Sequence, residues 1–202
     1  FYPSPQVDNG YDVADYLDVD PAFGTLEDVD CLIAEAHQRG MRIILDMVFN
    51  HTSTAHPWFR EAQQTKTNPR RDFYIWRDGD GATPPNQWQS KFGGSAWQWH
   101  AETGQYYLHL FAPEQADLNW VNPQVRAALK QVCQFWAARG VDGLRLDVIN
   151  LVSKDPAFPN DIAPGDGRRF YTDGPRIHEY LQEFNRDVFR PYGLITVGEM
   201  SS

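Results

Sequence analysis

Residues 143–149 read Gly-Leu-Arg-Leu-Asp-Val-Ile, an apolar run that is interrupted by one arginine and one aspartate. Side chains alternate between the two faces of a β-strand, so Arg145 and Asp147 share one face and the aliphatic side chains share the other. The aliphatic face suits packing against helices. The Arg–Asp pair must then point the other way, into the mouth of a barrel that such strands would form. The guanidinium favours the ionised carboxylate, so we expect a lowered pKa for Asp147. For an Arg-x-Asp pattern taken alone, a structural ion pair is the commoner explanation.

Two further apolar runs, residues 42–49 and 194–197, also predict buried parallel strands. Helical patterns lie before and between the three runs. Apolar residues spaced three and four apart form one stripe in each of three segments, 26–36, 125–136 and 177–188.

Residues at the ends of these segments agree with helix boundaries. Thr25 is a good N-cap with Asp28 three residues later, and Asn122 precedes a proline at the first helical position. Gly40 and Gly140 each fall between a helical segment and the next strand, where a left-handed residue ends a helix. The order is therefore helix–strand, a long insertion, and then helix–strand–helix–strand.

Alternation of this kind predicts a parallel α/β sheet. The insertion is too long for a loop and is rich in Trp and Tyr, so it predicts a small subdomain. A Rossmann-type sheet, the main alternative, would carry a glycine-rich phosphate turn, and none is present. We predict a partial (β/α)8 TIM barrel with a subdomain inserted after the third barrel strand. Its parts are residues 1–51 (second and third β/α units), 52–117 (the inserted B subdomain) and 118–202 (fourth and fifth strands).

Composition excludes several classes of protein. The net charge is −9 over 202 residues, so the chain lacks the excess of positive charge by which proteins bind nucleic acid or an anionic membrane. No apolar run approaches the roughly 20 residues that cross a bilayer. Cys31 and Cys133 lie among apolar residues in helical segments, so we expect two buried free thiols and no disulfide.

Polar residues end the other two predicted strands as well. Glu199 follows residues 194–198, and His51 follows the run that ends near Phe49. The mouth of a barrel lies at the carboxyl ends of its strands, so both side chains are expected to face it beside Asp147. A carboxylic acid there can act as a general acid, and a histidine can donate a hydrogen bond to a hydroxyl. Taken alone, a glutamate at the end of a strand is more often a solvated or capping residue, and the histidine is as readily explained as a core residue.

Taken in order, five segments resemble signature regions of the α-amylase superfamily of glycoside hydrolases. They are Asp-Asn-Gly-Tyr-Asp (8–12), Asp-Met-Val-Phe-Asn-His (46–51), Gln-Ala-Asp-Leu-Asn-Trp (115–120), Gly-Leu-Arg-Leu-Asp (143–147) and Val-Gly-Glu-Met (197–200). The third of these resembles the oligo-1,6-glucosidase branch. The resemblance covers essentially the whole chain, and it implies a retaining hydrolase of α-glucosidic bonds.

The resemblance also implies roles for individual residues. Asp147 would be the catalytic nucleophile and Glu199 the catalytic acid/base, while Arg145 would orient Asp147. The residues that would bind the non-reducing glucose are Asp8, Tyr11, His51, Phe92, Phe111 and Gln115. A third essential carboxylate of the family would lie beyond Ser202, so this chain alone is expected to be inactive.

Within that branch, the segments 90–97 and 165–170 resemble members that hydrolyse phosphorylated trehalose. The small-molecule partner would then be trehalose-6-phosphate, split into glucose and glucose-6-phosphate. A 6-phosphate needs a cation. Lys91 is the favoured candidate for binding it, and Arg168 and Arg169 are the others. Isomaltose-type oligosaccharides are the alternative substrates.

An alternative of another class is the non-catalytic ancillary subunit of an amino-acid transporter, which shares this fold. The presence of Arg145, Asp147 and Glu199 favours an enzyme. We expect no cofactor and no metal, and no nucleic-acid or membrane partner. A cytoplasmic location follows from the resemblance. The chain starts at Phe1 and stops just after a strand, so we also expect a piece of a longer protein.

Overall fold

The computed structural model describes residues 1–162 and 164–201 of the chain. Its central sheet consists of β1 (Ile44–Val48), β7 (Gly143–Asp147) and β8 (Ile195–Gly198), all parallel and ordered β1-β7-β8. Within the described ranges β1 and β8 each pair with a single strand, so they are the two edge strands of an open sheet. The three predicted strands are confirmed, each displaced by one or two residues at an end.

A helix precedes each of these strands, in the three segments where apolar stripes predicted helices. Helix α1 (Leu26–Gln38) precedes β1, α3 (Pro123–Ala138) precedes β7, and α5 (Ile177–Phe184) with the wide turn η3 (Asn185–Phe189) precedes β8. Thr25 caps α1 in a capping box with Asp28, and the side chain of Asn122 caps α3. Gly40 and Gly140 follow α1 and α3 with positive φ, as expected.

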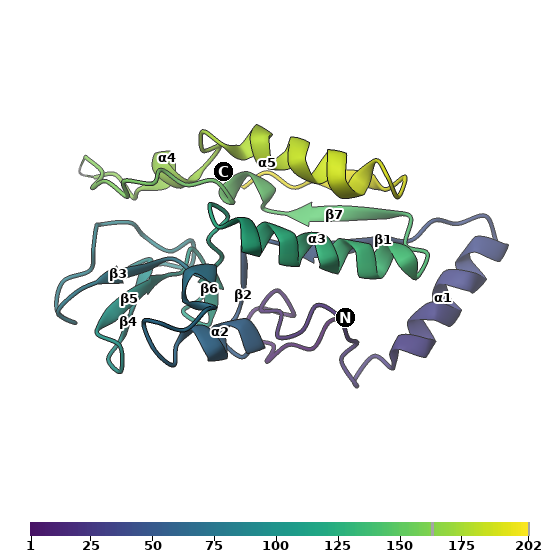
Figure 1. Ribbon diagram of the computed structural model, residues 1–202, viewed down its shortest axis with the longest axis horizontal. Coiled ribbons are helices and arrows are strands. Elements are labelled where there is room, and N and C mark those ends of the chain that lie inside the picture. The colour runs from purple at the N-terminus through teal and green to yellow at the C-terminus, as the bar shows by residue number, and fades with distance from the viewer. Residues whose placement is uncertain (163, 202) are drawn as a thin grey trace.

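The insertion forms two small antiparallel sheets. Strand β2 (His51–Ser53) pairs with β6 (Gln115–Asp117), and β3 (Trp76–Asp78), β4 (Trp97–His100) and β5 (Gln105–Leu108) are ordered β3-β5-β4. The short helices α2 (Pro57–Ala62) and η1 (Arg71–Phe73) lie between β2 and β3. In Figure 1 the arrow of β7 points toward the end of the molecule that carries these sheets, so the insertion lies at the carboxyl end of the parallel strands.

Two hydrophobic clusters join the insertion to the parallel sheet. The larger one combines Met47 and Leu146 of the sheet with Phe59, Tyr74 and other aromatic residues of the insertion. The smaller one surrounds Trp88 and continues into the segment after β7, which contains η2 (Ile149–Leu151) and α4 (Arg168–Tyr171). The insertion is therefore held by shared cores on two sides.

The prediction of two buried thiols is wrong for one of them. Both cysteines are free, and Cys133 is buried on α3, but Cys31 is exposed on α1. The buried residues of α1 are Ile33 and Ala36. Cys31 lies two positions before Ile33, about 200° around the helix, and so it faces away from the core.

Candidate active site

One guanidinium, that of Arg145 on β7, binds three carboxylates that lie on neighbouring parallel strands or directly after them. Its Nη1 donates to both oxygens of Asp46 on β1, at 2.8 and 2.6 Å, and to Oδ1 of Asp147 at 2.8 Å. Its Nη2 lies 2.9 Å from Oε2 of Glu199, the residue that follows β8. Strand register accounts for this geometry, because Asp46 stands opposite Arg145 and Leu146 stands opposite Gly198.

The chain turns sharply immediately after Asp147. Val148 has left-handed backbone angles of φ 38° and ψ 40°, which β-branched residues seldom adopt. Its amide donates to Oε2 of Glu199 at 3.2 Å, and the amide of Ile149 donates to the Glu199 carbonyl. The side chain of Val148 packs in the smaller cluster under the insertion. The expectation that it faces the helix layer is therefore wrong, because the turn ends the strand alternation at Asp147.

The pKa of Asp147 is shifted in the opposite direction from the one we expected. Burial raises the pKa of Asp147 to about 7, with a hydrogen bond to Glu199 and the charge of Asp46 acting in the same sense. The guanidinium of Arg145 lowers it, but by less than the other effects raise it. The charge of Arg145, which is shared among three carboxylates, lowers the pKa of Asp147 by less than burial raises it. The site therefore holds a carboxyl group that titrates near neutrality.

Asp46 is a residue of this site that the sequence interpretation missed. Besides its two contacts with Arg145, it accepts a hydrogen bond from the hydroxyl of Tyr11 at 3.1 Å. Burial, together with this contact to Asp46, raises the pKa of Tyr11, so the phenol stays protonated as a donor. The hydrogen bond to Asp46 is also the main reason for the raised pKa of Arg145. An acidic residue in the middle of an otherwise apolar strand was the available signal.

Four of the predicted sugar-binding residues meet beside these carboxylates. Gln115 Nε2 donates to Asp8 at 3.0 Å and lies 3.0 Å from Nε2 of His51. That same His51 nitrogen lies 3.1 Å from the carbonyl oxygen of Tyr11. Burial lowers the pKa of His51, so its imidazole is neutral. The cluster thus presents one carboxylate, one amide, one phenol and one neutral imidazole, which together donate and accept as a sugar hydroxyl requires.

Two aromatic rings extend this cluster outward. Phe111 lies 5.1 Å from the ring of His51, and Phe92 lies 5.7 Å from Phe111 in an edge-on arrangement. Phe92 is 60% exposed, so it forms the outer rim of the cluster. Its backbone is fixed by Ser90, whose hydroxyl accepts from the Phe92 amide and donates to the carbonyl of Phe111.

Two of the three candidate phosphate-binding cations, Lys91 and Arg168, lie near each other beside this rim. Lys91 precedes Phe92, and its Nζ lies 5.6 Å from the ring centre of Tyr171. Burial lowers the pKa of Lys91, and the nearby charge of Arg168 lowers it further. Arg168 pairs with Asp166 at 3.3 Å, whereas Arg169 pairs with Asp161 at 2.9 Å. The positive charges of Lys91 and Arg168, which lie on two neighbouring loops, thus repel each other.

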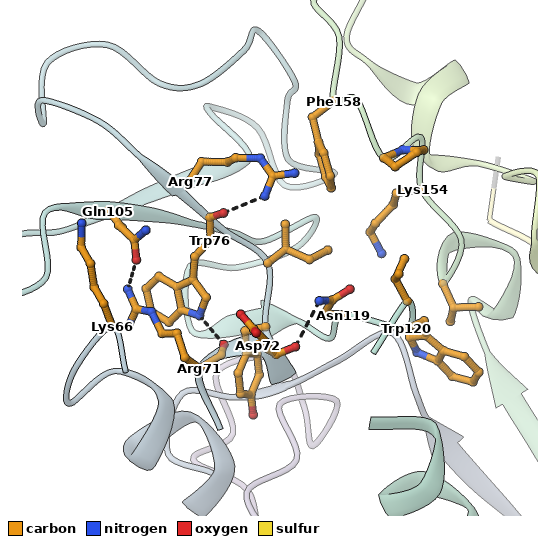
Figure 2. A pocket seen from close by; sticks show the side chains of 15 residues that line it. Lys66, Arg71, Asp72, Trp76, Arg77, Gln105, Asn119, Trp120, Lys154 and Phe158 are labelled. Carbon is orange, nitrogen blue, oxygen red and sulfur yellow. Dashed lines mark hydrogen bonds between the residues drawn. The ribbon is translucent and has the colours of Figure 1, made fainter. Parts of the chain in front are cut away.

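A separate cavity of about 370 Å³ lies between the insertion, the segment before α3 and the loop after η2. Figure 2 shows Trp76 with Arg71 on one side of it and Arg77 beside Phe158 on another. None of the predicted site residues lines this cavity, so it is distinct from the carboxylate cluster. Its lining residues are Lys66, Arg71, Asp72, Tyr74, Ile75, Trp76, Arg77, Gln105, Asn119, Trp120, Val121, Val152, Lys154, Pro156 and Phe158.

The described part of the chain contains neither a metal-binding cluster nor a helix that could cross a membrane. In residues 1–162 and 164–201, no group of three or more His, Cys, Asp or Glu side chains is arranged to hold a metal ion. Over the same residues, every helix is too short or too polar to cross a membrane.

Comparison with known proteins places this chain in a family. Residues 1–202 match the family model described as the alpha-amylase catalytic domain. The chain is 74% identical to trehalose-6-phosphate hydrolase of Escherichia coli K12 over its full length, and 50% identical to oligo-1,6-glucosidase of Parageobacillus thermoglucosidasius over 98% of it. The crystal structure of Bacillus licheniformis trehalose-6-phosphate hydrolase superposes on all of it, with a TM-score of 0.97 at 58% identity.

In each of these comparisons the chain spans 36% of the relative's own length. The predicted fold class, part of a (β/α)8 barrel with an inserted subdomain, is confirmed by the superposition on such barrels over the whole chain. The chain belongs to the α-amylase family of glycoside hydrolases.

Proposed function

We propose that this chain carries the nucleophile, Asp147, and the acid/base, Glu199, of an enzyme that hydrolyses α-glucosidic bonds with retention of configuration. The observation that supports this most directly is the shared guanidinium of Arg145, which binds both carboxylates at the ends of adjacent strands. Retaining glycosidases need two carboxyl groups roughly 5 Å apart, a spacing that neighbouring parallel strands supply. The presence of both groups also favours an enzyme over a non-catalytic ancillary subunit.

The reaction has two steps. In the first, an oxygen of Asp147 attacks the anomeric carbon, the glycosidic C–O bond breaks, and protonated Glu199 gives its proton to the leaving oxygen. In the second, Glu199 takes a proton from water, and the resulting oxygen attacks the anomeric carbon and releases Asp147. Arg145 keeps its charge throughout and stabilises the anionic form of Asp147. The raised pKa of Asp147 means that this cation is needed to keep a useful ionised fraction.

The polar cluster of Asp8, Tyr11, His51 and Gln115 beside the carboxylates is proposed to bind the non-reducing glucose. Asp8 and Gln115 are bonded to each other, and Gln115 lies against His51, so these three side chains form one polar wall. Neutral His51 and the phenol of Tyr11 are suited to bind hydroxyls without adding charge beside Asp147. Phe111 supplies an apolar face next to His51, and exposed Phe92 lies where a second sugar unit would leave the pocket.

The proposed substrate is trehalose-6-phosphate, which gives glucose and glucose-6-phosphate. The identity of 74% to a hydrolase of this substrate, against 50% to an oligo-1,6-glucosidase, supports the choice. Lys91 is proposed to bind the phosphate, since it stands next to Phe92 on the rim. The charge of Arg168 already lowers the pKa of Lys91, and a bound dianion would relieve this repulsion between the two cations. A cytoplasmic location is proposed because sugar phosphates are made or imported inside cells.

The test is a comparison of kcat/KM for trehalose-6-phosphate, trehalose and isomaltose, using the full-length parent protein. We expect trehalose-6-phosphate to be preferred by orders of magnitude, and Asp147→Asn to abolish turnover. Lys91→Gln should lower kcat/KM for the phosphorylated substrate alone. Lys66→Gln is the matched control, because Lys66 pairs with Asp78 away from the carboxylates.

Each other outcome excludes part of the proposal. A preference for isomaltose would keep the two catalytic assignments and remove the phosphate site at Lys91. Equal inactivity of wild type and Asp147→Asn on all three sugars would favour the ancillary-subunit alternative.

We also propose that the chain divides into three parts, residues 1–51, 52–117 and 118–202. The middle part supplies Phe92, Phe111 and Gln115 to the proposed sugar-binding site.

A further inference from the structure

The ammonium group of Lys154 is buried beside Asn50 and Asp117 and is fully hydrogen-bonded. Its side chain is 3% exposed, and Nζ lies 2.8 Å from Oδ2 of Asp117, which is itself 0% exposed. Nζ also donates to Oδ1 of Asn50 at 3.0 Å and to the carbonyl of Leu151 at 2.8 Å. A lysine has three protons to donate and no acceptor, so these three partners use all of them. Figure 2 shows Lys154 reaching in from the loop side of the cavity.

This ammonium and the carboxylate of Asp117 together fix the orientation of the Asn50 side chain. Because Lys154 can only donate, the amide atom that faces it is the oxygen, and the nitrogen must face the other way. The Asn50 nitrogen accordingly lies 3.1 Å from Oδ2 of Asp117 and 3.2 Å from Nδ1 of His51. An unaided asparagine could present either end to the histidine, because the two ends have nearly the same size.

The orientation of Asn50 in turn favours one tautomer of His51. An amide N–H donates to Nδ1, so Nδ1 is the acceptor and the ring proton sits on Nε2. Nε2 lies 3.1 Å from the carbonyl oxygen of Tyr11, which can only accept and therefore also favours a proton on Nε2. The amide nitrogen of Gln115, 3.0 Å from the same Nε2, is a donor and opposes that proton. With the proton on Nε2, His51 is a hydrogen-bond donor toward the Tyr11 carbonyl and the proposed sugar-binding residues.

We propose that Lys154 is a positioning residue, which holds His51 as the Nε2–H tautomer through Asn50 and so sets the hydrogen bond that His51 offers to the sugar. The role of His51 toward the sugar rests on the function proposed above, whereas the tautomer does not. Lys154 also joins the loop after η2 to β6 through Asp117. A residue with that bracing role alone would affect stability and leave the tautomer unchanged.

The experiment measures the tautomer and the activity separately. The full-length protein is labelled with ¹⁵N-histidine, and the two ring nitrogens of His51, identified by their loss in His51→Gln, are classed as protonated or unprotonated by chemical shift. Wild type should carry the proton on Nε2. In Lys154→Met the Nδ1–H tautomer should appear, and kcat/KM for p-nitrophenyl α-glucoside should fall about 10- to 100-fold, the scale of a misplaced active-site group.

The matched control is Lys130→Met. Lys130 Nζ bonds to Glu183 and Asp187, both at 2.9 Å, between α3 and the η3 turn. This variant loses a comparable pair of ion contacts far from the pocket, and it should keep the wild-type shifts and kcat/KM.

Two results would overturn the tautomer assignment, and a third would overturn its effect on the sugar. One is a wild-type His51 that carries its proton on Nδ1. The second is a folded Lys154→Met with unchanged shifts. The third is a changed tautomer with unchanged kcat/KM, which would keep the hydrogen-bond assignment but remove His51 from the proposed sugar site. If Lys154→Met does not fold, Asn50→Asp serves instead, since it keeps an acceptor for Lys154 and offers His51 Nδ1 no donor.

Discussion

At the scale of single residues, the ionisation of Asp147 controls when the site can react. Burial, the hydrogen bond to Glu199 and the charge of Asp46 raise the pKa of Asp147 to about 7. The attacking form is the anion, so protonation below this pKa removes the nucleophile. We therefore expect kcat/KM of the full-length protein to rise with pH through about 7, because kcat/KM reports the free enzyme. The apparent value belongs to the Asp147–Glu199 pair rather than to one residue.

Glu199→Gln tests this assignment. It removes the negative charge and alters the hydrogen bond that raise the pKa of Asp147, so the rising limb should move to lower pH. The substrate is p-nitrophenyl α-glucoside, whose leaving group needs no proton. Glu183→Gln, a carboxylate bonded to Arg126 and Lys130, is the control and should leave the limb in place. A limb that stays at the wild-type pH in Glu199→Gln would mean that another group titrates there.

Asp46 supports a second prediction at this scale. It holds Nη1 of Arg145 with both oxygens and also accepts from Tyr11. In Asp46→Asn one oxygen becomes an NH₂ group that faces the guanidinium donors, so Arg145 should shift away and take Asp147 with it. We expect kcat/KM to fall on the order of 10²-fold, the usual scale for a displaced reactive group. Steady-state kinetics on the full-length variant, with a melting curve, measures this.

The control for Asp46→Asn is Asp142→Asn at the opposite end of the parallel sheet. Asp142 binds Arg42 at 2.7 Å and His37 at 2.8 Å. Burial opposes ionisation of Asp142, but its hydrogen bonds outweigh this and lower its pKa to about 2. Its loss should lower the melting temperature without changing kcat/KM. An Asp46→Asn variant within about twofold of wild type would show that Arg145 needs no support from β1.

The sequence located Arg145, Asp147 and Glu199 because each lies in or directly after a recognisable strand. It did not locate Asp46, although the residue stands in a quoted motif. The contact between Asp46 and Arg145 depends on the register between β1 and β7, and strand order and register are set by tertiary packing. The same limit explains the wrong sign for the pKa of Asp147, since burial cannot be read from the neighbours of one strand.

At the scale of elements, the cap of α3 supports the third prediction. The side-chain oxygen of Asn122 accepts from the amide of Gln124 at 2.9 Å, while its nitrogen donates to the carbonyl of Asp72 at 3.0 Å. Asn122→Ala loses both bonds and should cost about 1 kcal/mol. Asn122→Asp keeps the cap and loses only the bond to Asp72, so it should stay closer to wild type.

Thermal melting of the full-length variants measures the Asn122 series. A drop of about 1–2 °C is expected for Asn122→Ala, since one kcal/mol moves the melting temperature less in a large protein than in a small one. If Asn122→Asp melted as low as Asn122→Ala, the contact with the insertion, and not the cap, would carry the stability.

Elements with a clear apolar period were predictable, and those without one were not. The stripes and caps of α1 and α3 are local, so the sequence specified their starts and ends. The sheet β3-β5-β4 was missed because its strands are only three or four residues long. Runs this short contain too few residues for alternation to distinguish a strand from a buried loop.

At the scale of the whole molecule, the insertion and the segment after β7 depend on each other through Trp88. This side chain is fully buried, and its indole donates to the carbonyl of Pro159 at 2.9 Å. Its ring centre lies 5.3 Å from that of Phe158 and 5.5 Å from that of Tyr171. The amide of Gln89 also donates to the carbonyl of Asp166. Lys91 and Arg168, one on each loop, are therefore placed by this shared packing.

Gly167 supports the fourth prediction, because it permits this close approach. It has a φ of +85°, and a Cβ added there would meet Cδ1 of Trp88 at 2.2 Å. Gly167→Ala therefore adds a clash with a buried ring to the backbone cost of about 1 kcal/mol for a left-handed alanine. Gly40→Ala is the matched control, because φ is +71° there and nothing lies within 4 Å of the added atom.

We expect Gly167→Ala to melt several degrees below Gly40→Ala. Displacement of the loop from Trp88 should separate Lys91 from Arg168, so kcat/KM should fall more for trehalose-6-phosphate than for p-nitrophenyl α-glucoside. Equal melting temperatures for the two variants would show that the packing between the loops contributes no stability. A parallel loss on both substrates would instead indicate that the loop after β7 supports the carboxylates as a whole and not the phosphate rim, because the two ends of that loop, at Val148 and at Gly167, would then move together.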